Sequence, residues 1–379
     1  MVIKKYFTLV LLLLLVPMTG CSLLNDVMAA VPAFDPGFAN TPILDEATHP
    51  PQPPSSSPTA SPTHMDTPTP TATEVIYDIG KELTLQYLWD LEITGSEITF
   101  ERQLAPTFYY EQSIVSYISE GNKIFGLLTI PRQDPPDNGF KAIIFNHGYI
   151  PPATYRTTER YYAYVDYLAR SGFVVFKIDF RGHGESEGEP QGSYFSPGYT
   201  IDAIAALKSL QTLDFIDPEG IGMWGHSMAG NLTLRAMLIE PEIKAGVIWA
   251  GAVYSYDDFA EYGIDDNTYR PPATPQATEQ PRRSQQIFDA YGRPDSGHPY
   301  WLAVSLTENI GVLESPLQIH HALDDTVVRI DYSYGLVAAL QEMDMEYEFY
   351  IYESGGHNLI SPSFGLAMVR TVQFFKDNL

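Results

Sequence analysis

The chain has 379 residues, of which 44% are hydrophobic and 13% aromatic, so it can bury a sizeable core and should be largely globular. Its formal net charge is -25, from 47 acidic against 22 basic side chains, which argues against a nucleic acid partner. Its single cysteine excludes an intramolecular disulfide, so the stability of the fold must come from the core.

Residues 1–20 begin with Lys4 and Lys5 and continue into an apolar run over 7–16 that is too short for a comfortable membrane span. Small residues follow and lead to Cys21. The segment resembles a bacterial lipoprotein signal peptide with its lipobox. This resemblance implies lipidation of Cys21 and an extracytoplasmic protein anchored to a membrane by lipid. The alternative is an ordinary secretory signal in which Cys21 is incidental.

Residues 21–73 are expected to connect this anchor to a folded domain. From 31 to 73 the sequence is rich in proline, threonine and serine and cannot bury apolar surface. We therefore expect an extended, disordered tether, with a glycosylated interaction stalk as the alternative.

Segments typical of an α/β domain occupy residues 74–379. In chain order, we predict strands at 121–131 and 141–146, a helix at 161–172, a strand at 173–179, a helix at 200–213, a strand at 220–224, a helix at 231–240, strands at 245–252 and 316–322, a helix at 332–343, a strand at 347–352 and a helix at 364–376. Strands that alternate with helices predict a doubly wound, mostly parallel sheet, with functional sites at the carboxyl ends of its strands.

This alternation breaks at residues 254–311, after the strand that ends near Ala252. The segment contains acidic and tyrosine-rich stretches, a low-complexity patch at 270–283, and Tyr300 next to Trp301. We predict an insertion over the site that forms either a lid or a surface loop with some helix.

The run GHSMAG at 225–230 places Ser227 where a strand should turn sharply into a helix. Small neighbours let the backbone make that turn and project a serine hydroxyl toward a base. This is the geometry of a nucleophile elbow. The five-residue pattern is too short to establish a nucleophile alone, so a histidine, an acid and an oxyanion site must be found elsewhere in the chain.

An acid and a histidine follow Ser227 in the order that this sheet topology requires. Asp324 follows the strand that ends in HHA, and His357 follows both the strand that ends in YIY and the glycine pair GG. We expect His357 to accept the Ser227 proton and Asp324 to hold the other ring N–H. Asp325 is the alternative acid, and Asp324 is favoured because it lies nearer to the strand end.

Two backbone N–H groups are expected to stabilise an oxyanion. The first belongs to Met228, the residue after the nucleophile, and the second to Tyr149 in the turn NHGY, where Gly148 lets the chain bend.

Several of these motifs resemble those of a known protein family. From about residue 126 onward, the segments NHGY, DFRGHGESEG (179–188), GHSMAG, HHALDDTVV (320–328) and GGH (355–357) are similar to those of the α/β-hydrolase family. The similarity is greatest to the branch shared by prolyl-oligopeptidase-like serine peptidases and related esterases. It implies an α/β-hydrolase fold and assigns Arg181 and His183 structural roles.

We therefore expect a serine hydrolase that forms an acyl-enzyme with carboxylic esters or short peptides. A prolyl-oligopeptidase-like aminopeptidase is one alternative, and a non-catalytic binding lipoprotein is another. No cofactor or metal is expected. The adjacent residues His320 and His321 should point to opposite faces of a strand, and the acidic cluster Asp257, Asp258, Glu261, Asp265 and Asp266 matches no calcium loop.

Overall fold

The computed structural model describes residues 77–264, 283–294 and 297–379. The predicted signal peptide (1–20), Cys21 and the tether (21–73) lie outside the described residues. So do Asp265, Asp266 and nearly all of the low-complexity patch at 270–283. Within the described residues, no helix is both long enough and apolar enough to cross a membrane.

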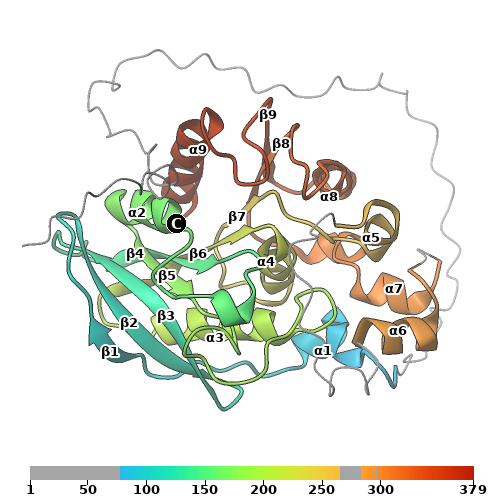
Figure 1. Ribbon diagram of the computed structural model, residues 1–379, viewed down its shortest axis with the longest axis horizontal. Coiled ribbons are helices and arrows are strands. Elements are labelled where there is room, and N and C mark those ends of the chain that lie inside the picture. The colour runs from blue at the N-terminus through green and yellow to red at the C-terminus, as the bar shows by residue number, and fades with distance from the viewer. Residues whose placement is uncertain (1–76, 265–282, 295–296) are drawn as a thin grey trace, which may run out of the picture. The chain divides into compact units, whose positions relative to one another are not determined.

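A nine-stranded sheet forms the centre of the protein (Figure 1). Its strands are β1 (Thr99–Gln103), β2 (Tyr110–Ser119), β3 (Asn122–Pro131), β4 (Phe140–Asn146), β5 (Val174–Ile178), β6 (Ile216–His226), β7 (Gly246–Trp249), β8 (Leu317–Ala322) and β9 (Tyr347–Tyr352). They lie in the order β1-β2-β3-β5-β4-β6-β7-β8-β9. The six strands from β5 to β9 in this order pair in parallel, whereas β1, β2 and β3 add an antiparallel extension. The predicted mostly parallel α/β sheet is confirmed.

Successive side chains of the central strands pack into two separate hydrophobic clusters. Ile144, Phe176 and Met223 belong to one cluster, while their neighbours Ile143 and Trp224 belong to the other. Because side chains alternate between the two faces of a strand, the central strands are buried on both faces of the sheet. Burial on both faces explains why these strands appear in the sequence as short, nearly continuous apolar runs.

Helices cover both faces of this sheet. The α-helices are α1 (Leu85–Trp89), α2 (Tyr162–Arg170), α3 (Gly198–Leu210), α4 (Met228–Ile239), α5 (Tyr256–Tyr262), α6 (Arg283–Tyr291), α7 (Pro299–Val304), α8 (Asp331–Glu342) and α9 (Ser363–Asn378). In the described part of the chain, the short 3-10 helices η2 (Lys81–Leu83), η3 (Pro152–Thr154) and η5 (Thr307–Val312) accompany them. Residues of α2 and α9 belong to the cluster that contains Trp224, and residues of α3, α4 and α8 belong to the opposite cluster. In Figure 1, α2 and α9 accordingly lie together, apart from α3 and α4.

The described parts of the segment 254–311 are helical and well packed. The segment contains α5, α6 and α7 and most of η5, and the side chains of Tyr300 and Trp301 are buried. Tyr77 lies edge-on to both Tyr291 and Tyr300, with ring centroids 5.9 and 5.3 Å away. The aromatic residues at 300 and 301 therefore belong to the core, and the N-terminal part of the domain packs against this segment.

Candidate active site

Ser227 occupies the sharp turn between β6 and α4. Its backbone has a φ of 56° and a ψ of -122°, a left-handed conformation that is rare for a residue other than glycine. A Cβ at Gly225 would lie 2.3 Å from Thr233 Oγ1 and 2.5 Å from the carbonyl oxygen of Ala229. The turn therefore needs a residue without a side chain before the serine, and the predicted elbow geometry is present.

His357 lies against this serine. Its Nε2 atom is 2.8 Å from Ser227 Oγ, within hydrogen-bond distance. The imidazole follows β9 in a short loop in which Gly355 and Gly356 have φ values of 137° and 59°. Only glycine adopts such angles readily, so the glycine pair lets the loop turn His357 toward the serine.

The acid that contacts His357 is Asp325. Asp325 Oδ2 lies 2.8 Å from His357 Nδ1, and the Asp325 side chain is completely buried. The prediction that Asp324 holds this ring nitrogen is wrong. Asp324 is exposed and accepts the backbone N–H groups of Gly356 at 2.8 Å and Gly355 at 3.3 Å. Proximity to the strand end is a poor guide here, because the turn after β8 directs the second of the two aspartates inward.

The surroundings of Asp325 favour its ionised form. Its Oδ1 atom accepts the N–H groups of Val327 and Val328 at 2.8 and 3.0 Å, and His321 Nε2 lies 3.2 Å from Oδ2. Burial alone would raise the pKa of Asp325, but hydrogen bonds from His321 and His357 outweigh it and hold the pKa below its usual range. A carboxylate at this position places the His357 proton on Nδ1 and leaves Nε2 free to accept a proton from Ser227.

Two residues that the sequence analysis did not predict join the parts of this site. Tyr161 OH accepts the N–H of Gly148 at 2.9 Å and lies 2.7 Å from His226 Nδ1, and His226 Nε2 lies 2.8 Å from the carbonyl oxygen of His357. Burial lowers the pKa of His226 to about 3, so this imidazole is neutral at physiological pH. His226 then donates from Nε2 to His357 and accepts the Tyr161 proton at Nδ1.

This chain of hydrogen bonds links three separate segments, the turn NHGY, the elbow and the loop that carries His357. The position of His226 inside GHSMAG is the one signal in the sequence that hints at its role. The Tyr161 contacts have no such signal, because they join residues far apart in the chain.

Ser227 and His357 lie in a cleft of about 950 Å³. Tyr149 and Met228, whose N–H groups are the predicted oxyanion donors, line the same cleft. Phe259 and Ile264 line it as well, so the segment 254–311 contributes part of the wall. The predicted site residues Ser227, His357, Tyr149 and Met228 thus line one cleft at the carboxyl ends of the parallel strands. Asp324 lies just after the end of β8 and contacts the loop that carries His357, but not its imidazole. Cys21 lies outside the described residues.

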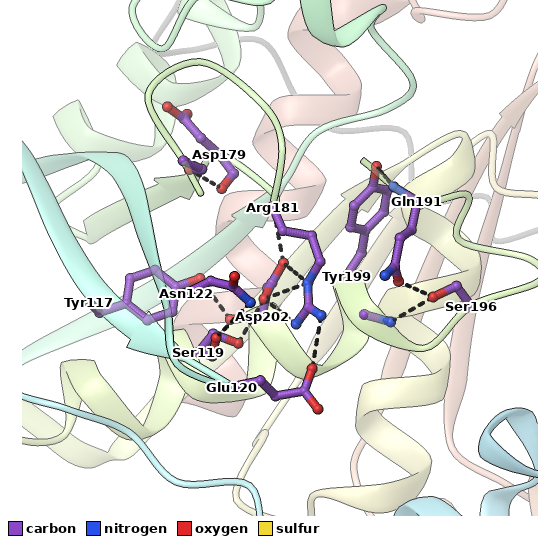
Figure 2. Close-up of polar contacts among 12 residues, drawn as sticks. Tyr117, Ser119, Glu120, Asn122, Asp179, Arg181, Gln191, Ser196, Tyr199 and Asp202 are labelled. Atoms are coloured by element: carbon purple, nitrogen blue, oxygen red, sulfur yellow. Dashed lines mark hydrogen bonds and ion pairs between the residues drawn. The ribbon is translucent and has the colours of Figure 1, made fainter. Parts of the chain in front are cut away.

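Arg181, whose side chain is largely buried, lies in a network of polar contacts with Asp202 and Glu120 (Figure 2). Its Nη2 atom is 2.7 Å from Asp202 Oδ1, and its Nη1 atom is 2.8 Å from Glu120 Oε2. Ser119 Oγ also donates to Asp202, at 2.7 Å. These contacts fasten the loop after β5 to α3 and to the β2–β3 hairpin, so the geometry agrees with a structural role for Arg181. His183 is also buried, and its Nε2 atom lies 3.3 Å from the carbonyl oxygen of Ile150.

The histidines of β8 have separate protein partners. His320 Nδ1 lies 2.8 Å from Tyr352 OH, whereas His321 Nδ1 lies 2.7 Å from Ser333 Oγ. Across the described residues, no group of three or more His, Cys, Asp or Glu side chains is arranged to hold a metal ion.

Comparison with known proteins gives the same picture of the fold. The sequence model of the Prolyl oligopeptidase family matches residues 159–379, which include Ser227, Asp325 and His357. Protein ABHD12B of Homo sapiens is 27% identical over 195 residues, which are 52% of this chain and 48% of that protein. The polyketide transferase claH of Penicillium crustosum is 29% identical over 99 residues, 26% of this chain and 32% of that protein. The chain therefore matches less than half the length of these relatives.

Two solved structures share the architecture at low sequence identity. Acetyl xylan esterase 1 from a Thermoanaerobacterium species aligns with a TM-score of 0.56 and 16% identity, covering 81% of this chain and 96% of that one. Dipeptidyl peptidase 4 of Porphyromonas gingivalis aligns with a TM-score of 0.53 and 20% identity, covering 72% of this chain and 36% of that one. Both support the α/β-hydrolase fold.

Proposed function

Because the chain belongs to the prolyl oligopeptidase family, and is a hydrolase with the α/β-hydrolase fold, we propose that it forms an acyl-enzyme at Ser227. One observation carries this proposal. Ser227 Oγ and Asp325 Oδ2 each lie 2.8 Å from a different nitrogen of the same imidazole, His357. An activated serine nucleophile requires this sequence of hydroxyl, base and carboxylate.

In this proposal, Ser227 Oγ attacks the substrate carbonyl carbon while His357 Nε2 takes the hydroxyl proton. The N–H groups of Met228 and Tyr149 stabilise the oxyanion of the tetrahedral intermediate. His357 then protonates the leaving group as the bond to it breaks, which leaves the acyl group on Ser227. Water activated by His357 releases the acid and restores the serine.

We propose carboxylic esters as the substrates. The described lining of the cleft contains no aspartate or glutamate, and so offers no carboxylate to pair with the ammonium group of a peptide N-terminus. Aromatic and aliphatic side chains, among them Tyr164, Phe259 and Ile360, line much of its wall and suit an apolar acyl group. Hydrolysis of short peptides by an aminopeptidase-like activity is the second candidate.

We further propose that lipid on Cys21 anchors the enzyme outside the cytoplasm. The support is the resemblance of residues 1–21 to a lipoprotein signal. Radiolabelled palmitate should be incorporated into the protein in bacterial cells and should be absent from Cys21→Ser. Equal incorporation in the two proteins would contradict the anchor.

Release of nitrophenol from nitrophenyl butyrate tests the proposed activity. Because hydrolysis of the acyl-enzyme should be slower than its formation from this activated ester, we expect a burst of about one nitrophenol per protein molecule, and its loss in Ser227→Ala. Ser193→Ala is the matched control, because Ser193 lines the same cleft but its hydroxyl lies 3.4 Å from Asn231 Oδ1. Full activity in Ser227→Ala would overturn the proposal. A correctly folded parent protein without any esterase or peptidase activity would favour a binding lipoprotein instead.

A further inference from the structure

We propose that Arg160 gives the cleft a subsite for an anionic group, so that it selects substrates with a carboxylate at the end remote from the scissile ester. The inference rests on the proposed function for the site of bond cleavage, and it goes further by naming the substrate class. The described lining of the cleft contains no aspartate, glutamate or lysine, and Arg160 is its only arginine.

Arg160 makes no hydrogen bond or ion pair with any described residue, and its side chain is exposed. Two nearby arginines, in contrast, have partners within the protein. Arg156 donates to the carbonyl oxygen of Tyr155 at 2.6 Å, and Arg170 lies 3.4 Å from Asp166 Oδ2. Acidic side chains outnumber basic ones by 47 to 22, so carboxylate partners are plentiful in this chain. A guanidinium that borders the cleft with its donors available can instead pair with a carboxylate of the substrate.

The backbone beside Arg160 is held in place. The next residue, Tyr161, has a φ of 58°, and its hydroxyl group contacts both the N–H of Gly148 and His226 Nδ1. These contacts tie the base of the Arg160 side chain to the predicted oxyanion turn and to the elbow. Arg160 thus lines the cleft from a backbone that these contacts hold in place, while Ser227 defines the position of the reacting carbonyl.

The net charge of the protein would not by itself lead to a preference for anionic substrates. A formal net charge of -25 gives the protein no general attraction for anions, so a preference for an anionic ester must come from a local cation. The same guanidinium would repel the ammonium group of a peptide N-terminus. Arg160 therefore favours monoesters of dicarboxylic acids that have an apolar chain, and it disfavours aminopeptidase substrates.

Matched nitrophenyl esters test the subsite. Glutaryl, adipoyl and suberoyl monoesters carry a terminal carboxylate, and pentanoyl, hexanoyl and octanoyl esters have the same chain lengths without it. The measured quantity is the ratio of kcat/KM for each charged ester to that for its neutral counterpart, at low ionic strength. For the length that reaches the guanidinium, Arg160→Gln should lower this ratio by about tenfold or more, as expected for a lost charge-assisted hydrogen bond.

Arg156→Gln is the control, because it removes a charge from the same loop but not from the cleft, and it should leave the ratio within about twofold of the parent value, as for a screened surface charge. An unchanged ratio in Arg160→Gln at every chain length would overturn the proposal. So would equal losses in the two variants, because a general electrostatic effect would then explain both.

A binding measurement separates the subsite from catalysis. Ser227→Ala, which cannot turn over an ester, is titrated with phenylbutyrate and with the neutral phenylbutyramide in a calorimeter. If Ser227→Ala binds phenylbutyrate more tightly than phenylbutyramide, and the double variant with Arg160→Gln does not, the result supports the subsite. This holds even if the parent protein hydrolyses no ester and the proposed function fails. Equal binding of the two compounds to Ser227→Ala would overturn the subsite, even if the esters are hydrolysed.

Discussion

His357 Nδ1 lies 2.8 Å from Asp325 Oδ2, while the side chain of the adjacent Asp324 faces the backbone of the loop that carries His357. The two aspartates therefore support the same histidine in different ways. Asp325 contacts the imidazole itself, and Asp324 holds the backbone N–H groups of Gly355 and Gly356.

This arrangement predicts unequal effects of removing the two charges. Asp325→Asn should lower kcat by about 10³- to 10⁴-fold, because an amide favours the wrong tautomer of His357 and does not stabilise the imidazolium. Asp324→Asn keeps one oxygen, which can accept one of the two glycine N–H groups, and it should cost less than about tenfold in kcat, in line with the loss of one hydrogen bond outside the reacting groups. Both values of kcat are measured from the hydrolysis of a nitrophenyl ester. A larger loss in Asp324→Asn would reverse the assignment of the acid.

His321 should help to position Asp325. Its Nε2 atom lies 2.9 Å from the carbonyl oxygen of Val328 and 3.2 Å from Asp325 Oδ2, so it must carry a proton to avoid facing two acceptors with a lone pair. His321→Asn should lower kcat by about tenfold, the cost of a hydrogen bond to a charged group. It should also shift the acidic limb of the pH profile of kcat/KM.

The neighbouring His320→Asn is the control, because His320 is equally buried but contacts Tyr352 and Gln318. It should affect thermal stability without moving the pH profile. Identical pH profiles for the parent and both variants would show that His321 has only a packing role.

His226 should make the free energy of unfolding depend on pH. The pKa of His226 is about 3 in the folded protein, against about 6.5 in an unfolded chain, so only the unfolded state binds this proton between these values. Stability therefore falls as the pH drops through this window, by about 1.4 kcal/mol per pH unit at most.

Between pH 6.5 and 4.5, urea unfolding should show the parent protein losing about 2 kcal/mol more than His226→Gln, which cannot be protonated. Other buried histidines contribute equally to both proteins and cancel in the difference. The same pH dependence in the two proteins would contradict the neutral state of His226.

Tyr161 should support both the oxyanion turn and the elbow through its hydroxyl group. Tyr161→Phe leaves the N–H of Gly148 and the Nδ1 atom of His226 without this partner, which should cost about 1 to 3 kcal/mol of stability and should also lower kcat. Tyr110→Phe is the control, because its buried ring carries a hydroxyl bonded to Asp166, away from the cleft. A loss of kcat as large in Tyr110→Phe would show that general loosening of the fold is responsible.

The fold could largely be predicted from the sequence, because strands buried on both faces are short apolar runs. The strand predicted at 141–146 differs from β4 by one residue, and the one predicted at 347–352 coincides with β9. Neither β2 nor β1 was predicted, and β1 is the harder of the two to find. Its sequence, TFERQ, is exposed along its whole length, so no apolar pattern marks it, and pairing with β2 defines it instead. The short helix α1 was also missed, because five residues give too little periodicity.

The site was predicted where a motif fixes the backbone. Gly225 and the pair Gly355 and Gly356 mark the turns that present Ser227 and His357, so the contact between these two side chains was expected from the sequence. The choice between Asp324 and Asp325 depends on the direction of one turn, which residue types alone do not specify. The bond between Tyr161 and His226 spans 65 residues and likewise leaves no mark in a single sequence.

Reaction with a fluorophosphonate probe tests the central claim most directly, because the probe phosphonylates a serine only when a neighbouring base activates it. Peptide mapping by mass spectrometry should find the adduct on Ser227 and on no other serine. Labelling should be stoichiometric in the parent protein and should be lost in both Ser227→Ala and His357→Ala. An unlabelled parent protein of native fold, or an adduct on a different serine, would contradict the account.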